Sequence, residues 1–201
     1  MLLIYDRIGI AGLLLVALSV ASLYYFIKTA LFLSWTWRDF RTWFVSVERG
    51  KVDLRRLQPE EPANPLGFIM VSLARAPASR LKDLDSEVTW LFHRAFGSTN
   101  LALTLLRLIS VLSPLLGLMG TVLGISRVFR SIATHTVVDN TLLAGGIWEA
   151  LITTIMGLAV AIPTLVFYYV LRLRVRALML ESIEYGHRVA ETTGGVEKNG
   201  A

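Results

Sequence analysis

Apolar and charged segments alternate along the chain on a scale that predicts membrane helices. Three runs contain no charged residue: residues 8–27 with 20 positions, residues 108–126 with 19 and residues 150–171 with 22. About 20 apolar residues span the hydrocarbon core of a bilayer, so each run is long enough for a transmembrane helix. We expect an all-α membrane protein whose three transmembrane helices continue into long cytoplasmic helical extensions.

The segments between these runs predict further helices. Apolar residues recur at helical spacing over residues 40–47, 66–73 and 81–92, whereas the three prolines in residues 58–65 predict a loop and Gly194–Ala201 predicts a disordered tail. The expected order is a first transmembrane helix at residues 8–37, a cytoplasmic helical domain at 38–100, a second transmembrane helix at 101–129, a periplasmic hairpin at 130–143, a third transmembrane helix at 144–171, and a cytoplasmic helix with its tail at 172–201.

The distribution of lysine and arginine predicts the orientation in the membrane. Residues 38–100 carry ten of them and residues 172–201 carry five, whereas only Arg7 precedes the first apolar run. Because positively charged loops stay in the cytoplasm, we expect the N-terminus outside and the C-terminus inside. Arg127 and Arg130 then lie outside, against the trend. The alternative for the first run is a cleavable signal peptide, but its start lacks net positive charge and the run is too long.

Composition excludes several classes of protein. A hydrophobic content of 54% and a mean hydropathy of +0.59 do not fit a soluble enzyme. The net charge of +5 does not indicate nucleic-acid binding, because eight acidic residues are interleaved with the basic ones in residues 38–100. Cysteine is absent, and His93, His135 and His187 lie far apart. We therefore expect no metal site and no cofactor.

Small residues and one hydroxyl share a face of the second predicted span. Steps of three and four residues bring together Ser113, Gly117, Gly120, Thr121 and Gly124. Such a face lets helix backbones approach closely, and packing alone would explain it, with Thr121 bonded to a carbonyl of its own helix. The other interpretation is that Thr121 borders an ion path.

The third predicted span repeats this pattern. Thr153 and Gly157 lie on one face, Thr154 lies on the neighbouring face, and Pro163 is in a position to kink the helix. Glu149 stands one turn before Thr153. A carboxylate within a span is a functional candidate, but a glutamate near the outer interface is an equally good interpretation.

No acidic residue lies deep within any of the three expected transmembrane helices, apart from the off-centre Glu149. A proton pathway needs a titratable group that takes up and releases protons. If the chain conducts protons, we expect another chain to supply that group.

Two motifs on consecutive spans resemble those of the ExbB/TolQ/MotA proton-channel family, and most closely its three-span ExbB and TolQ branch. They are LLGLMGTVLGISRVF at residues 115–129 and GIWEALITTIMGLAVAIP at residues 146–163. By motif, Thr121 and Thr154 match the family's pore-facing threonines and Glu149 matches its third-span glutamate. Thr153 stands where ExbB-like sequences commonly have a small apolar residue, so the choice between Thr153 and Thr154 stays open.

The resemblance implies a ring, expected to be a pentamer, in the bacterial inner membrane. Its second and third spans would surround a dimeric, single-span ExbD- or TolR-like partner with an intramembrane Asp. Proton entry would move that partner, and the motion would pass to a TonB- or TolA-like energy transducer that acts on the outer membrane. The chain would then be a stator in contact with membrane lipid, and not an enzyme.

Two other classes are weighed against this hypothesis. A non-conducting membrane scaffold would use the same small-residue faces only to assemble a partner complex. A small-solute carrier fits poorly, because three spans show no internal repeat and no pair of broken helices. The sequence also leaves open whether the role is ExbB-like import or TolQ-like envelope maintenance, and whether motion is rotary.

Overall fold

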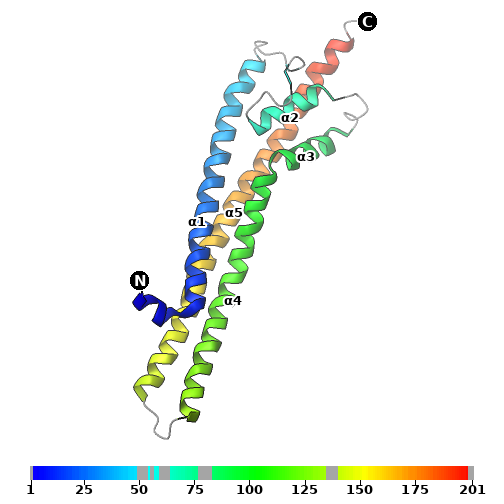
Figure 1. Cartoon of the computed structure of the whole chain (residues 1–201). Helices are drawn as coiled ribbons and strands as arrows, with labels where there is room; N and C mark the ends of the chain where they lie inside the picture. Colours follow the sequence, from blue (N-terminus) through cyan, green and yellow to red (C-terminus); the bar gives the residue numbers. More distant parts are fainter. Residues whose placement is uncertain are drawn as a thin grey trace. The chain divides into compact units, whose positions relative to one another are not determined.

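The structure is a computed structural model that describes residues 2–48, 54, 57–58, 64–76, 83–134 and 140–198. All regular structure in these ranges is α-helical, and Figure 1 labels the five helices. They are α1 (Leu2–Glu48), α2 (Pro65–Ala74), α3 (Leu84–Ala95), α4 (Gly97–Thr134) and α5 (Asn140–Lys198).

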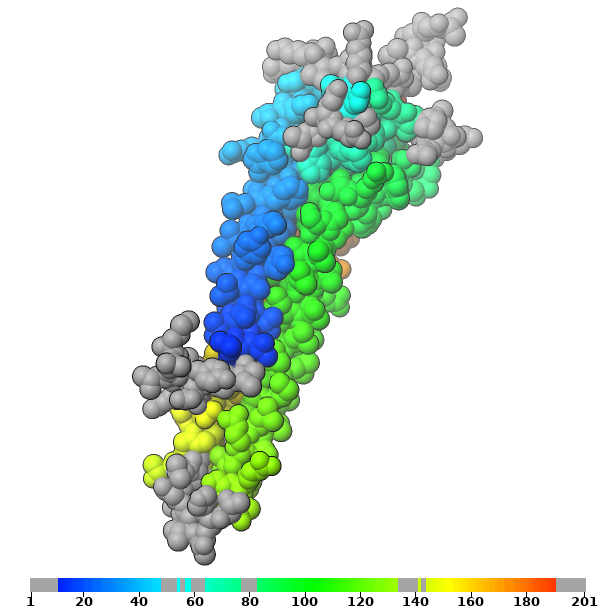
Figure 2. Space-filling view, viewed as in Figure 1, coloured from blue at the N-terminus to red at the C-terminus, as the bar shows by residue number. Residues whose placement is uncertain are grey.

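Three of the described helices are long and apolar enough to cross a membrane. The candidate spans lie within Ala11–Val47 of α1, Gly97–Ala133 of α4 and Ala144–Ala190 of α5. Each is longer than the roughly 20 residues that a bilayer requires. Large apolar side chains are exposed along them. Figure 2 shows the outer surfaces of α1 (blue) and α4 (green) in space-filling form. The predicted all-α class with three such helices is confirmed.

The long helices extend further than the sequence predicts. Helix α4 continues to Thr134 and α5 begins at Asn140, so most described residues of the expected hairpin at 130–143 are helical. Helix α5 also continues through Gly194 to Lys198, where a disordered tail was expected; residues 199–201 lie outside the described residues. Lengthening an existing helix avoids the cost of nucleation, and this offsets the low helix propensity of glycine.

The chain divides into two compact units, to which α1, α4 and α5 all contribute. Unit 1 is Met1–Ile27 with Ala102–Val170, and unit 2 is Lys28–Leu101 with Leu171–Ala201. In unit 1, the residues buried inside are mostly small or hydroxyl-bearing: Ala11, Ser22, Ser113, Ala150, Thr153, Ala161 and Thr164. One aromatic pair, Phe26 with Phe167, stacks with ring centroids 4.1 Å apart.

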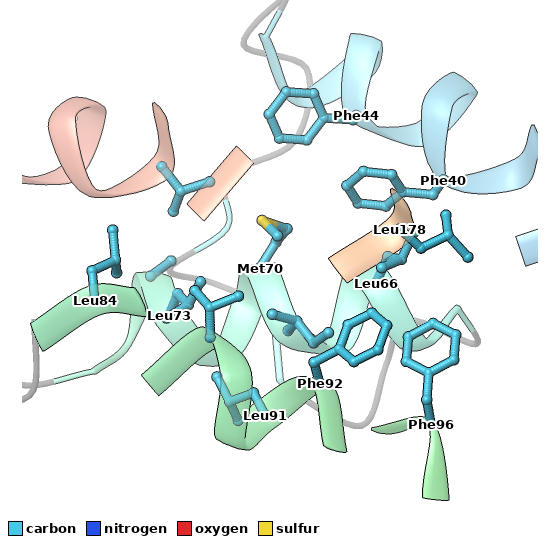
Figure 3. Close-up of a cluster of buried hydrophobic side chains, with 14 of the residues drawn as sticks. Phe40, Phe44, Leu66, Met70, Leu73, Leu84, Leu91, Phe92, Phe96 and Leu178 are labelled. Carbon is cyan, nitrogen blue, oxygen red and sulfur yellow. The ribbon is translucent and has the colours of Figure 1, made fainter. Parts of the chain in front are cut away.

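Unit 2 has a conventional hydrophobic core. Figure 3 shows its aromatic and aliphatic side chains converging from α1, α2, α3 and α5. Phe40 and Phe44 of α1 contact Tyr185 of α5, with ring centroids 5.2 and 4.4 Å apart. The apolar positions predicted at residues 40–47, 66–73 and 84–92 supply most of this core, whereas Leu81 lies outside the described residues.

A buried asparagine fixes the start of α2 within unit 2. The Asn64 side-chain oxygen accepts a hydrogen bond from the Leu66 amide at 3.0 Å, as an N-cap does. The Asn64 amide nitrogen donates to the Thr36 carbonyl at 2.8 Å and to the Asp39 carboxylate at 2.9 Å. One side chain thus caps α2 and ties it back to α1.

Candidate functional site: a hydroxyl pair between two apolar helices

Helices α4 and α5 approach each other closely within unit 1. A Cβ atom added to Gly157 would lie only 2.6 Å from the Ser113 carbonyl oxygen, and one added to Gly117 would lie 2.9 Å from the Thr153 carbonyl oxygen. Backbone atoms cannot rotate away as a flexible side chain can. Only glycine fits at these two positions at this helix separation.

The same contact extends toward the connected ends of the two helices. A Cβ atom on Gly120 would lie 2.7 Å from the Thr153 hydroxyl oxygen, and one on Gly124 would lie 2.8 Å from the Ala150 Cβ. The face that combines Ser113 with the glycines of α4 therefore lies against α5.

Two threonine hydroxyls meet in this contact, and we call Thr121 and Thr154 the hydroxyl pair. Their Oγ1 atoms are hydrogen-bonded to each other. Thr121 Oγ1 also lies 3.1 Å from the Ala150 carbonyl oxygen, and both hydroxyls lie 3.2 Å from the Gly117 carbonyl oxygen. Each side chain is half-buried. The pair can exchange hydrogen bonds among three partners without any charged group.

Thr153 occupies a different environment from its neighbour. Its side chain is buried, with 4% exposed, and its hydroxyl donates to the Ala150 carbonyl at 2.7 Å. It lies against Gly120. The structure therefore brings Thr121 and Thr154 together and places Thr153 in the helix-packing surface.

Glu149 forms an ion pair that the sequence analysis did not predict. One of its carboxylate oxygens lies 3.7 Å from an Arg127 guanidinium nitrogen, so the pair links α5 to α4. The Glu149 side chain is 31% exposed and that of Arg127 is 65% exposed. An exposed pair of this kind contributes about 0–1 kcal/mol in water.

Helices α4 and α5 both continue through an internal proline. Pro163 is exposed, and Thr164 beside it donates its hydroxyl to the carbonyl four residues earlier at 2.7 Å. Ser113, beside Pro114, does the same at 2.8 Å. These side chains add hydrogen bonds where proline removes a backbone donor.

The site offers oxygen atoms but little charge. Glu149 is the only acidic residue in residues 102–134 and 140–170. Within the described ranges, no group of three or more His, Asp or Glu side chains could hold a metal ion. The hydroxyl pair is therefore suited to hydrogen-bond a water molecule or a carboxyl group.

Sequence reasoning missed the role of hairpin symmetry. The pairs that meet across α4 and α5, such as Thr121 with Thr154 and Arg127 with Glu149, are nearly symmetric about residue 138. Folding the sequence back on itself at the middle of the expected hairpin, residues 130–143, would have brought both pairs to within about one helical turn of each other. The hydrogen bond between Thr121 and the Ala150 carbonyl could not be predicted in this way, because every residue has a backbone carbonyl and only the folded geometry selects this one.

Comparison with known proteins identifies the family. Residues 79–183, just over half of the chain, match the MotA/TolQ/ExbB proton channel family, which is not a known family of enzymes. The matched segment includes the hydroxyl pair, the glycines of the helix contact and the Arg127–Glu149 pair.

Individual relatives carry the names of two branches of this family. The chain is 48% identical over 65 residues to biopolymer transport protein exbB1 of Vibrio cholerae, covering 32% of this chain and 28% of that one. It is 33% identical over 118 residues to the Tol-Pal system protein TolQ of Haemophilus influenzae, covering 59% and 50%. It is 44% identical over 66 residues to the biopolymer transport protein ExbB of Helicobacter pylori, covering 33% and 46%.

The chain spans half or less of the length of these relatives. The matched segment nevertheless holds most of α4 and α5, two of the three helices long enough to cross a membrane. The chain is a multi-pass membrane protein and belongs to the MotA/TolQ/ExbB proton channel family.

Proposed function

We propose that this chain is a stator subunit of a proton-driven motor in the bacterial inner membrane. Five copies form a ring around an ExbD- or TolR-like single-span partner. Movement of that partner energises a TonB- or TolA-like protein that acts on the outer membrane, in import or in envelope maintenance. The chain catalyses no reaction itself.

The observation that carries this proposal is the hydroxyl pair within the matched segment. Thr121 and Thr154 place two half-buried hydroxyls between apolar helices, where a packing surface needs none. Among the described residues, the hydrogen-bond partners of the two hydroxyls include no carboxylate, which supports a titratable group supplied by the partner. Glu149, with its Arg127 partner, marks one end of the same path.

The proposed mechanism couples charge to movement. A proton that crosses the membrane gains about 2.3 kcal/mol per 100 mV of potential. The hydroxyl pair hydrogen-bonds the partner's ionised carboxylate, directly or through water. Protonation neutralises that carboxylate, which then leaves the hydroxyls for an apolar surface, and the partner shifts within the ring.

The arrangement in the membrane follows from charge. Fifteen lysine and arginine residues in residues 38–100 and 172–201 support a cytoplasmic location for these segments. The N-terminus and the connection between α4 and α5 are then periplasmic. Arg127 and Glu149 stand on either side of the connection between α4 and α5 in the sequence. Their ion pair would therefore lie toward the periplasmic end of the path.

One observation favours the alternative, a non-conducting scaffold. The close contacts at Gly117 and Gly157 would hold α4 and α5 together whether or not protons pass, and the two threonines would then only reinforce the contact. The two functions differ in whether the hydroxyls are needed after assembly is complete.

Proton flux into liposomes under an imposed potential separates them. The complex of this chain with its single-span partner is compared with the Thr154→Val complex and with a complex whose partner lacks its Asp. Thr164→Val is the matched control, because it removes a buried hydroxyl that bonds only within α5. Flux lost in the first two variants and kept in the control, with all complexes intact, supports the channel. Equal flux in all of them, or flux in none, supports the scaffold.

A further inference from the structure

A groove of about 520 Å³ lies in unit 2 between α1 and α5. Its walls combine apolar, aromatic and charged side chains. The residues that decide its chemistry are Leu33, Trp37 and Arg38 of α1 and Arg174, Leu178 and Glu181 of α5.

The charges of this groove favour an anion. Arg38 and Arg174 both line it, and Arg174 Nη1 donates a long hydrogen bond, of 3.4 Å, to the Ser34 hydroxyl. The single acid, Glu181, accepts a hydrogen bond from Trp37 Nε1 at 2.7 Å. Glu181 is therefore held by the indole, and two guanidinium groups are left to bind a ligand from outside. Guanidinium groups suit phosphate because they donate paired, parallel hydrogen bonds.

The groove lies where each helix changes from apolar to charged sequence. On α1 the residues from 29 to 37 carry no charge and Arg38 begins the charged segment; on α5 the uncharged run ends at residue 171. Leu33 and Leu178 are almost fully buried and form an apolar floor. In a multi-pass membrane protein this boundary lies at the depth of the lipid headgroups, where tryptophan is also favoured.

We propose that the groove binds the headgroup of an anionic glycerophospholipid, with the phosphate on Arg38 and Arg174 and the start of an acyl chain against the apolar floor. A lipid supplies in one molecule the phosphate and the apolar chain that the groove accommodates. Trp37 contributes to the site by donating a hydrogen bond to the Glu181 carboxylate. This binding is independent of proton conduction.

Native mass spectrometry of the full chain, purified in detergent, tests this proposal. The protein is titrated with phosphatidylglycerol and, separately, with phosphatidylcholine of the same acyl chains. Arg38→Gln and Arg174→Gln each remove one proposed phosphate ligand. Arg176→Gln is the matched control, because it removes the same charge from α5 at an exposed position outside the groove.

We expect phosphatidylglycerol to bind more tightly than phosphatidylcholine. Each groove variant should weaken binding of phosphatidylglycerol by roughly fivefold, the effect of one basic residue near an anionic lipid surface. Arg176→Gln should change it by less than about twofold, since Arg176 lies outside the groove. All of the substituted side chains are exposed, so circular dichroism should show that each variant folds as the parent does.

Four outcomes would overturn the proposal. Equal weakening by Arg176→Gln would show attraction to the basic surface as a whole, and equal binding of both lipids would show a purely apolar contact. Displacement of the lipid by low millimolar inorganic phosphate would show a site for a free anion. Loss of oligomer mass in a lipid-free Arg38→Gln/Arg174→Gln double variant would show that a second copy of the chain covers the groove.

Discussion

Replacing Gly157 by alanine should force α4 and α5 apart. The new Cβ would lie 2.6 Å from the Ser113 carbonyl oxygen and 3.0 Å from the Gly117 Cα, and both neighbours are backbone atoms. Ordinary contact begins at 3.4 Å, so the helices must separate by about 0.8 Å at this point. Two hydrogen-bonded hydroxyl oxygens normally lie about 2.5–3.0 Å apart. A shift of this size would therefore move the oxygens of the hydroxyl pair out of that range.

Two opposing terms set the magnitude of this effect. Inserting a methyl group into a tightly packed contact costs about 1–3 kcal/mol. Replacing glycine by alanine inside a helix returns up to about 1 kcal/mol. Gly145→Ala on the same helix isolates the second term, because nothing lies within 4 Å of a Cβ atom at that position. The difference between the two variants should therefore be about 1–3 kcal/mol.

The free energy of unfolding of each variant can be measured by SDS titration in mixed micelles, with helix content followed by circular dichroism. We expect Gly145→Ala to be as stable as the parent or slightly more stable, and Gly157→Ala to be less stable. If the two variants unfold at the same SDS fraction, the backbone contact at Gly157 is not tight and the packing argument fails. Proton flux gives a second readout, because Gly157→Ala should also reduce flux by disturbing the hydroxyl pair.

Three further predictions address hydrogen bonds and charge. In a double-mutant cycle, Thr121→Val and Thr154→Val should show a coupling energy of about 0.5–1.5 kcal/mol, because the two hydroxyls bond each other within apolar helices. Asn64→Ala should destabilise the protein by about 1–3 kcal/mol in chemical unfolding, since it removes the N-cap of α2 and the hydrogen bonds that the Asn64 amide donates to the Thr36 carbonyl and the Asp39 carboxylate. Glu149→Gln should change the free energy of unfolding by less than about 1 kcal/mol, because its pairing with Arg127 is partly exposed.

Each of these predictions has a control that can contradict it. For the double-mutant cycle, the control combines Thr121→Val with Thr164→Val, and their losses of unfolding free energy should simply add. A coupling energy as large as that of Thr121→Val with Thr154→Val would refute a direct bond between Thr121 and Thr154. Asn64→Ser keeps an oxygen for the cap but loses both amide donors, so it should fall between the parent and Asn64→Ala; no difference from Asn64→Ala would refute the capping role. A loss above about 2 kcal/mol in Glu149→Gln would mean that the ion pair is far less solvated than its exposure indicates.

The sequence predicted the parts of the fold that depend on hydrophobic periodicity. Uncharged runs of about the length that spans a bilayer, together with apolar spacing in residues 66–73 and 81–92, identified all five described helices, and the glycine spacing identified the face that α4 turns toward α5. Each of these patterns extends over many residues, so the prediction of a helix does not depend on any single position. Helix lengths were less well predicted, because the glycines at positions 194 and 195 predict a helix end, whereas α5 continues to Lys198.

Single contacts between distant residues were beyond the sequence. Asn64 was assigned to a proline-rich loop, since its capping role depends on Thr36 and Asp39 lying nearby after folding. Likewise, the ion pair between Glu149 and Arg127 was not predicted, because the sequence showed Arg127 only as a basic residue on the side of the membrane where few were expected. Which of two adjacent hydroxyls meets Thr121 depends on the rotation of α5, and the structure places Thr154 there.

The hydroxyl pair contains only two hydrogens, and the protein holds acceptors for both. One hydroxyl donates to the other, and the second donates to the Gly117 or Ala150 carbonyl. A group that arrives from outside therefore meets oxygen lone pairs. A neutral carboxyl group can only offer its own hydrogen to oxygen atoms that already take part in hydrogen bonds. An ionised carboxylate is a stronger acceptor than a backbone carbonyl and would draw one of the two hydroxyl hydrogens to itself, so protonation of the carboxylate would remove the reason for this exchange.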